Sequence, residues 1–146
     1  MAEQTEGTTE IDATPAEVME VISDYEAYPE WASGVKQTEI KKTDSQGRPS
    51  EVWFEVGQMG IGAKYTLAYK YKAKDGGVSW SSKNCSGAVK SIDGEYVLEP
   101  GKKGTKVTYR TTMELAISLP GLMKRQAEKT IINTALGGLK KRVESR

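Results

Sequence analysis

The sequence has no histidine and a single cysteine, Cys85, among its 146 residues. Histidine is the commonest metal ligand and the ordinary general base near neutral pH. Zinc sites of the usual kinds, Ser-His-Asp triads and Cys-His dyads are therefore excluded. One cysteine cannot form an internal disulfide. Any chemistry must come from Tyr, Lys, Arg, Asp or Glu, or from the shape of a pocket, and we expect neither a metal nor a cofactor.

Long apolar runs are also missing. The first ten residues, MAEQTEGTTE, are acidic and polar where a secretory signal would be basic and then apolar. No apolar run approaches the roughly 20 residues that span a bilayer. These features predict a cytoplasmic protein. We expect one domain over residues 1–146, long enough to bury about two-thirds of its unfolded surface.

Charge is balanced overall, at 21 basic and 20 acidic residues, but it is unevenly placed. Residues 1–34 contain acids and no Lys or Arg, whereas bases dominate residues 124–146. The two ends could attract one another, or each could be a solvated face. Alternatively, the terminal LKKRVESR segment could make a transient membrane contact through a C-terminal helix. No RNA or DNA motif accompanies the bases, so we expect no nucleic-acid partner.

A strand and then a helix are indicated at the start of the chain. Small and β-branched residues before Ile11 indicate a strand over about residues 4–12. Thr14 is a good N-cap, Pro15 takes the first helical position, and Glu17 completes a capping box. An apolar stripe at helical spacing follows, formed by Val18, Val21, Ile22 and Tyr25.

The next segment, DYEAYPEWASGV (24–35), places three large rings around a proline. Pro29 is expected to push Tyr28 toward extended geometry, so that the helix ends before it and a short turn runs through Glu30 and Trp31. Tyr25 then reads as a core contact. Tyr28 and Trp31 read as corner residues that close one end of the fold or line the rim of a pocket.

From residue 34 to about 115, apolar residues occur at every second position, the pattern of β-strands. Polar turns containing glycine separate the strands at 45–50, 74–77 and 99–105. One strand face is apolar and aromatic and the other is polar, which is typical of an antiparallel sheet covered on one side. Arg110 and Glu55 fall on the polar face, and Glu39 is expected to be solvated. The inward positions are Val52, Phe54, Val56, Tyr65, Leu67, Tyr69, Tyr71, Ile92, Tyr96, Leu98, Val107, Tyr109, Thr111, Met113 and Leu115.

The cover for this sheet is predicted from about Leu119 to Val143, where apolar residues recur at helical spacing. A helix of about 24 residues would be roughly 36 Å long, enough to cross a sheet. Gly137 and Gly138 are anomalous inside it, since each costs about 1 kcal/mol relative to Ala. They should mark close packing, a bend, or a place where the helix yields to open a pocket.

The segments IDATPAEVMEVISDYEAYPEWASGV (11–35), GRPSEVWFEV, YTLAYKY and DGEYVLEPGKKGTKVTYRTTMEL, with a final helix led by Pro-Gly, together resemble the START-like superfamily (SRPBCC, helix-grip). The branch they most resemble is polyketide cyclase/dehydrase and lipid transport, which includes the coenzyme Q-binding proteins. The resemblance implies an α+β helix-grip fold: a curved antiparallel sheet of about seven strands around a long C-terminal helix, two short helices after the first strand, and a central cavity. Members of the superfamily include lipid carriers, hormone binders and aromatase/cyclases, so the resemblance implies a ligand class better than an activity.

Twelve residues are predicted to line the cavity and bind a ligand. Aromatic residues on one strand face more often form plain core, but five of the tyrosine hydroxyls would need partners, which a cavity and its ligand can supply. The candidates are Phe54, Val56, Tyr65, Leu67, Tyr69, Trp80, Tyr96, Tyr109, Thr111, Met113, Ile131 and Ala135. No catalytic residue is assigned.

We expect the protein to bind or transport a small hydrophobic ligand, either lipid-like or aromatic and polyketide-like. The alternative is a polyketide aromatase/cyclase or dehydratase, in which a tyrosine or a water acts as acid or base. A third possibility is a partner-binding module whose cavity is filled by Trp and Tyr. The sequence does not define the oligomeric state.

Overall fold

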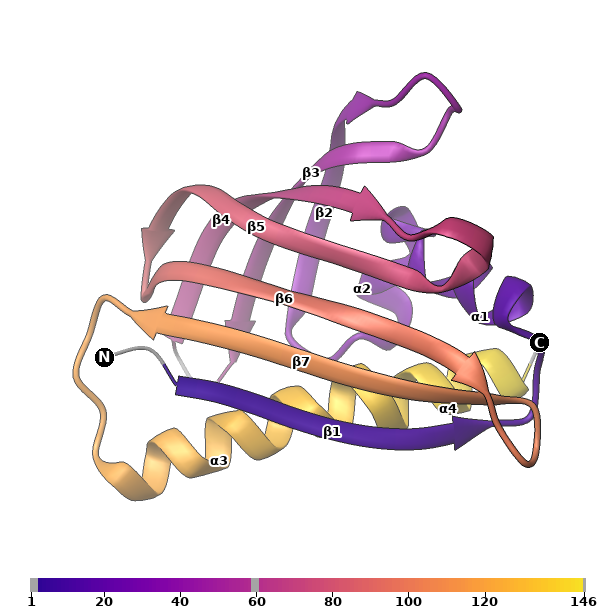
Figure 1. The fold of residues 1–146 in the computed structure, drawn as a ribbon. Helices are drawn as coiled ribbons and strands as arrows, with labels where there is room; N and C mark the ends of the chain where they lie inside the picture. The colour runs from indigo at the N-terminus through magenta and orange to yellow at the C-terminus, as the bar shows by residue number, and fades with distance from the viewer. Residues whose placement is uncertain (1–2, 59–60, 146) are drawn as a thin grey trace.

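The computed structural model describes residues 3–58 and 61–145 and shows a curved sheet wrapped around one long helix (Figure 1). All neighbouring strands are antiparallel, in the order β1-β7-β6-β5-β4-β3-β2. This confirms the predicted helix-grip architecture. The strands are β1 (Glu3–Ile11), β2 (Val35–Thr43), β3 (Pro49–Gln58), β4 (Ile61–Tyr71), β5 (Gly77–Gly87), β6 (Val89–Pro100) and β7 (Thr105–Leu115).

The first helix begins as its sequence predicts. In α1 (Pro15–Ile22) the Glu17 backbone N–H donates to the Thr14 hydroxyl at 3.2 Å, and the Thr14 N–H donates to the Glu17 carboxylate at 3.0 Å. These two bonds satisfy donors that would otherwise be unpaired at the helix start. Val18, Val21 and Ile22 are buried, so the apolar stripe faces the core.

The turn that follows α1 corrects the prediction for Tyr28. Two short elements, the 3₁₀ helix η1 (Tyr25–Ala27) and α2 (Tyr28–Trp31), continue the chain, and Tyr28 is helical at φ −54°, ψ −40° despite preceding Pro29. Tertiary contacts override the steric preference. The Tyr28 hydroxyl donates to the Ile22 carbonyl, and its ring lies 5.3 Å from that of Tyr25 and 5.0 Å from that of Trp31. The Ala32 N–H then closes the turn on the Tyr28 carbonyl.

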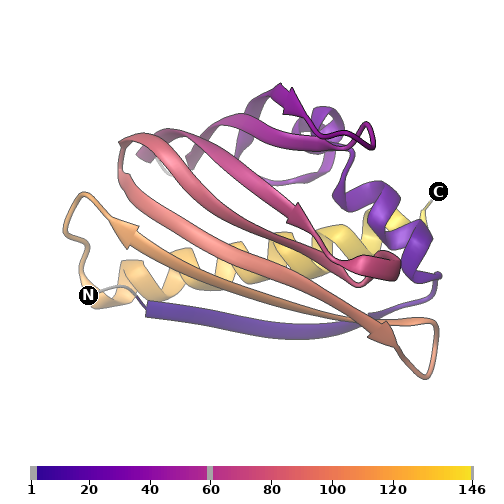
Figure 2. The same ribbon diagram turned by 45° about the horizontal axis from the view of Figure 1, so that its top comes forward.

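The C-terminal helix crosses the concave face of the sheet beside β1 (Figures 1 and 2). The predicted long C-terminal helix is confirmed and runs in three consecutive parts: α3 (Gly121–Ile132), the π-helical segment η3 (Asn133–Gly138) and α4 (Leu139–Glu144). Both anomalous glycines lie in the π-helical segment. A Cβ on Gly138 would make an ordinary contact with the Trp31 ring at 3.5 Å and Gly137 faces open space, so close packing requires glycine at neither position.

The two oppositely charged ends of the chain meet at α4. Arg142 pairs with Glu30 at 3.2 Å, and the Lys140 ammonium donates to the Glu10 carbonyl at 2.7 Å and to the Glu144 carboxylate at 2.8 Å. The Asp12 backbone N–H also donates to Glu144. Part of the terminal basic cluster is therefore used to hold α4 against the N-terminal third of the chain.

The inward strand positions predicted from the period of two form the core. Val52, Val78 and Val107 are fully buried, and Ile11 and Leu139 close the core under α4. On the outer face, Arg110 binds Glu6 and Glu95, as its outward parity indicates. No helix among the described residues is long and apolar enough to cross a membrane.

The sheet has one irregular edge, at β2. This strand pairs only with β3 within the sheet, and its register shifts between Val35 and Gln37 and again on both sides of Lys42. Most of its side chains are polar or charged, and Lys41 pairs with Glu39 on the strand itself. The opposite edge strand, β1, lies beside the C-terminal helix (Figure 1).

A short 3₁₀ turn, η2 (Ala73–Asp75), joins β4 to β5 at the end of the sheet nearest α1. Lys74 and Asp75 adopt positive φ there, and Gly77 follows at φ +121°. A Cβ on Gly77 would lie 1.9 Å from the Tyr96 carbonyl oxygen, so glycine is required where this turn meets β6. The turn lets β5 start directly beside Tyr96 and directs Trp80 onto the concave face.

Candidate functional site

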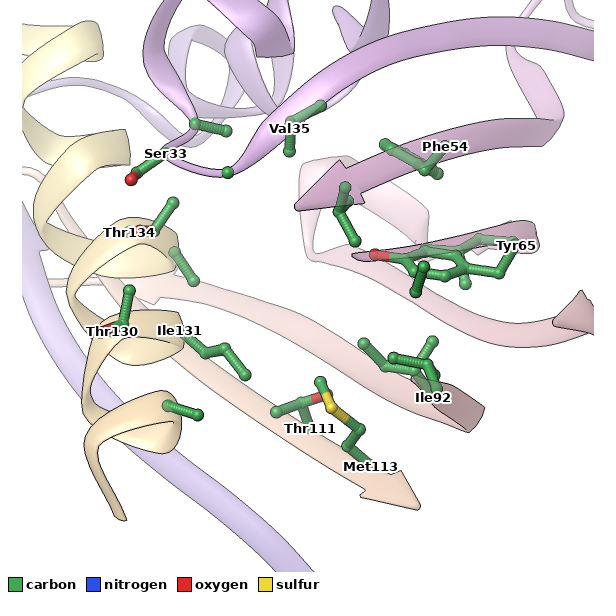
Figure 3. Close-up of a pocket in the computed structure, with 18 of the residues that line it drawn as sticks. Ser33, Val35, Phe54, Tyr65, Ile92, Thr111, Met113, Thr130, Ile131 and Thr134 are labelled. Carbon is green, nitrogen blue, oxygen red and sulfur yellow. The ribbon is translucent and has the colours of Figure 1, made fainter. Parts of the chain in front are cut away.

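A cavity of about 310 Å³ lies between the concave face of the sheet and the C-terminal helix. Figure 3 shows its walls, with Phe54 and Tyr65 on the strands facing Thr130, Ile131 and Thr134 on the helix. Its volume falls at the lower end of the range of about 300–1,000 Å³ typical of small-molecule sites. The geometry therefore suits a compact ligand.

The strand wall of the cavity is a connected set of aromatic rings. Trp80 is central, with ring centroids 6.1 Å from Tyr69, 5.7 Å from Tyr96 and 5.8 Å from Tyr109. Phe54 and Tyr65 extend the wall, 5.8 Å apart. These separations are those at which tilted and edge-to-face rings attract one another. The wall is consequently flat, apolar and held in place by ring-to-ring contacts.

The tyrosine hydroxyls divide into two groups. Those of Tyr25 and Tyr71 lie 3.1 Å apart, and Tyr71 also donates to the Pro49 carbonyl, so this pair is structural. Tyr96 donates to the Ala135 carbonyl at 2.8 Å and joins the sheet to the π-helical segment. For Tyr65 and Tyr69, no described residue provides a hydrogen-bond partner to the hydroxyl. These two groups remain free to bind a ligand.

Burial keeps the cavity tyrosines protonated. It raises the pKa of Tyr65 and Tyr69 well above the ordinary value, and it raises the pKa of Tyr109 to about 12, offset in part by a hydrogen bond with Thr111. A phenol with so high a pKa is a hydrogen-bond donor at neutral pH and a poor general base. The wall can thus orient an oxygen of a ligand more readily than it can remove a proton from one.

One fully buried nitrogen of the wall has no hydrogen-bond partner among the described residues. The Trp80 indole nitrogen, Nε1, is buried, and no described group accepts its hydrogen. The indole lies over Gly94 on the neighbouring strand, where a Cβ would lie 2.8 Å from Trp80 Cζ2 and 2.5 Å from the Arg110 carbonyl oxygen. Glycine is therefore the only residue at position 94 that leaves space for this ring.

Charged groups lie at the α3 side of the cavity. Among the described lining residues the acidic side chain is that of Glu128, which accepts a hydrogen bond from Thr5 at 3.1 Å. The basic side chain is that of Lys124, one helical turn earlier. Neither belongs to the aromatic wall. In the described ranges no group of three Cys, Asp or Glu side chains is placed to hold a metal ion.

The structure brings all twelve predicted site residues to the cavity surface. Their role as ligand contacts stays a prediction. Sequence reasoning missed further lining residues. Ile92 and Leu115 share the inward parity of Tyr96 and Tyr109, so a signal for them existed. Ser33, Val35 and Val89 lie at loops or strand starts, where no period marks them.

Comparisons with known proteins agree with this fold. The family model described as polyketide cyclase/dehydrase and lipid transport matches residues 2–144. No curated protein matches the sequence significantly. A START superfamily protein from Mycobacterium smegmatis has a similar structure, with a TM-score of 0.84 at 22% identity over 97% of each chain.

Two further solved structures carry functional names. The Zhui aromatase/cyclase of a Streptomyces species has a TM-score of 0.74 at 14% identity, over 100% of this chain and 96% of that one. A STAR-related lipid transfer protein fragment from Xanthomonas axonopodis has a TM-score of 0.67 at 19% identity, over 95% and 84%. At such identities these structures show the fold alone. The predicted resemblance to the START-like superfamily is confirmed, and the similarity to coenzyme Q-binding proteins stays a prediction.

Proposed function

The chain belongs to the polyketide cyclase/dehydrase and lipid transport family, and from that premise we propose that it binds a small ring-containing apolar molecule in its central cavity. The observation that carries the proposal is the aromatic wall, in which the hydroxyls of Tyr65 and Tyr69 form no hydrogen bond with the described residues. A wall of this kind offers a flat apolar surface and a few fixed donors, which is the composition expected of a binding site for small molecules.

The proposed mechanism is sequestration. Apolar surface that moves from water into the cavity contributes about 25 cal/mol per Å² to affinity. The hydroxyls of Tyr65 and Tyr69 then orient the oxygens of the ligand, because each can donate a hydrogen bond while remaining protonated. A carrier of this type needs no reactive group, in keeping with the absence of histidine from the sequence.

The alternative is a polyketide aromatase/cyclase or dehydratase. It draws support from the fold that the chain shares with the Zhui aromatase/cyclase and from tyrosine hydroxyls able to donate to an enolising carbonyl. Binding is favoured over catalysis because the carboxylate that lines the cavity, Glu128 on α3, accepts a hydrogen bond from Thr5 on β1 and does not belong to the aromatic wall. A cyclase would need a base that reaches the bound chain.

Titration with the uncharged fluorescent probe N-phenyl-1-naphthylamine tests the proposal. We expect saturable binding by the wild-type chain and loss of binding in Ile131→Trp, which would fill the cavity from the helix side. Leu122→Trp is the matched control, since Leu122 lies on the same helix and is 72% exposed. Equal binding by both variants would place the probe outside the cavity and contradict the proposal.

Native mass spectrometry of gently purified protein separates the two functions. A co-purified apolar compound that is released unchanged supports a carrier. Conversion of a linear poly-β-ketone mimic to a cyclised or dehydrated product, lost in Ile131→Trp, would instead establish the enzyme. A transient membrane contact through the C-terminal helix stays a separate prediction, tested by vesicle binding with and without anionic lipid.

A further inference from the structure

The indole nitrogen of Trp80 is a hydrogen-bond donor without an acceptor among the described residues. The side chain is 9% exposed, lines the cavity, and its Nε1 has no acceptor among the described residues. Buried polar groups in folded proteins are nearly always paired, so an unpaired one calls for a specific reason. An indole nitrogen can only donate, and it therefore cannot be satisfied by another donor.

The surroundings of Trp80 explain why no protein group fills this role. Its indole is fixed over Gly94, and the next strand places Thr111 beside Gly94. The Thr111 hydroxyl donates to the Asp93 carbonyl at 3.3 Å. The Ala135 carbonyl accepts from Tyr96. Neither group forms a hydrogen bond with Nε1, so the donor stays unpaired among the described residues.

We propose that Trp80 Nε1 donates a hydrogen bond to an acceptor oxygen of the bound ligand, and that Trp80 thereby selects ring compounds bearing a carbonyl over the corresponding hydrocarbons. This inference rests on the proposed binding function and narrows its ligand class. Ketones and quinones fit the requirement, because a carbonyl oxygen accepts and carries no proton of its own.

The flanking rings show how the oxygen reaches the nitrogen. Nε1 is covered in this structure, so one neighbour must move when the ligand enters. The Tyr96 hydroxyl is hydrogen-bonded to the Ala135 carbonyl, and the ring of Tyr109 packs on those of Trp80 and Tyr96 at 5.8 and 5.0 Å. Tyr69 is half-buried, and no described residue hydrogen-bonds its hydroxyl. Tyr69 is therefore the neighbour that moves, and its hydroxyl can then donate to the same carbonyl oxygen.

A pair of probes of the same shape tests the inference directly: 1-acetylnaphthalene, which carries a carbonyl, and 1-isopropenylnaphthalene, in which a CH₂ group replaces the oxygen. The chain has three tryptophans and hence three indole N–H signals in a nitrogen-15 correlation spectrum. We expect 1-acetylnaphthalene to move the Trp80 indole proton downfield, as a new hydrogen bond requires, and 1-isopropenylnaphthalene to leave it nearly unchanged. The signal is assigned by its loss in Trp80→Phe.

Affinities provide a second readout. Trp80→Phe keeps an aromatic ring and removes the donor, so the preference for 1-acetylnaphthalene over 1-isopropenylnaphthalene should fall by roughly three- to tenfold. Trp53→Phe removes an indole N–H from a position outside the cavity lining and should leave the preference unchanged. Using the ratio of two affinities cancels any general loss of packing.

The outcomes separate this inference from the proposed function. If both probes bind with equal effects on the Trp80 signal, the cavity binds apolar rings, the proposed function stands and the role of Trp80 is wrong; the indole then donates to a neighbouring ring face. If neither probe binds, both proposals are wrong. If Trp80→Phe does not fold, the wild-type spectrum decides, with the Trp80 signal assigned as the one that persists in both Trp31→Phe and Trp53→Phe.

Discussion

The two halves of the C-terminal helix differ in how they are held. None of the residues of α3 is buried, and Leu122 and Met123 near its start are 72% and 41% exposed. The second half is anchored: Ala135 and Leu136 of the π-helical segment and Leu139 and Val143 of α4 are all buried. One helix thus consists of two parts: the cover, which is the loosely packed α3, and the base, which is the firmly packed segment from Asn133 to Glu144.

This difference follows from what lies beneath each half. The base packs on α1 and β1, where Leu139 is fully buried, and side-chain bonds from Lys140 and Glu144 secure it. The cover lies over the cavity, so its inward side chains lack the close neighbours that a core provides. The hydrogen bond from Tyr96 to Ala135 marks the boundary between the halves. Structural stability and access to the cavity can therefore be altered separately within one helix.

Among the variants that compare the two halves of the helix, the largest change in the free energy of unfolding is expected from a substitution at Leu139. Leu139→Ala removes a fully buried side chain and should lower the free energy of unfolding by about 2–5 kcal/mol. Leu122→Ala, on the exposed cover, should change it by about 0.5 kcal/mol or less. Urea unfolding of both variants measures the contrast, and similar losses would show that the two halves are equally anchored.

A smaller effect is expected from Tyr96→Phe, which removes the bond to the Ala135 carbonyl. The free energy of unfolding should fall by roughly 0.5–1.5 kcal/mol, and amide hydrogen exchange should quicken in residues 133–138 and in α3 while α4 stays protected. Tyr71→Phe is the matched control, since it removes a hydroxyl bonded to Pro49 away from the helix. Uniform exchange along the whole helix would refute a yielding segment at Gly137 and Gly138.

The smallest effect concerns pH and Glu144. The Asp12 backbone N–H and the Lys140 ammonium hold the pKa of the Glu144 carboxyl below its ordinary value. A lowered pKa in the folded state gives stability that is present above the unfolded pKa of about 4.5 and is lost as pH falls through the folded pKa. The stability difference between wild type and Glu144→Gln should therefore shrink on acidification below about pH 4.5.

The control for this measurement is Glu99→Gln, at an exposed position on β6. Thermal unfolding from pH 7 to pH 3 follows both variants, and a Glu144→Gln difference that stays constant over this range would contradict the predicted linkage.

Most of the fold could be predicted because its signals are local. The capping box at Thr14 and Glu17, the parity of the strands and the helical spacing near the C-terminus each depend on residues close together in sequence. Nine of the twelve cavity residues followed from strand parity and two, Ile131 and Ala135, from helical spacing, whereas Trp80 was assigned for its aromatic side chain. Signals of this kind do not say which inward residues touch a ligand and which only pack.

The remaining features depend on contacts between distant residues. The helical Tyr28 before Pro29 is held by the Ile22 carbonyl and neighbouring rings, and the π-helical segment is matched to Tyr96 on β6. The unpaired Trp80 nitrogen could not be foreseen either, because an unmet hydrogen bond is visible only when every neighbour is placed. Ser33 and Val35 reach the cavity from a loop and a strand start, where periodicity gives no information.

The irregular β2 edge has a consequence for the behaviour of the protein in crowded solution. An exposed edge strand can add a strand from another molecule and so start aggregation. Shifts in the β2 register interrupt its hydrogen-bonding pattern, and a neighbouring chain would have to bury Lys41 and Lys42, both highly exposed, to pair with it. The sheet thus ends in a strand whose register and charge oppose the addition of a further strand.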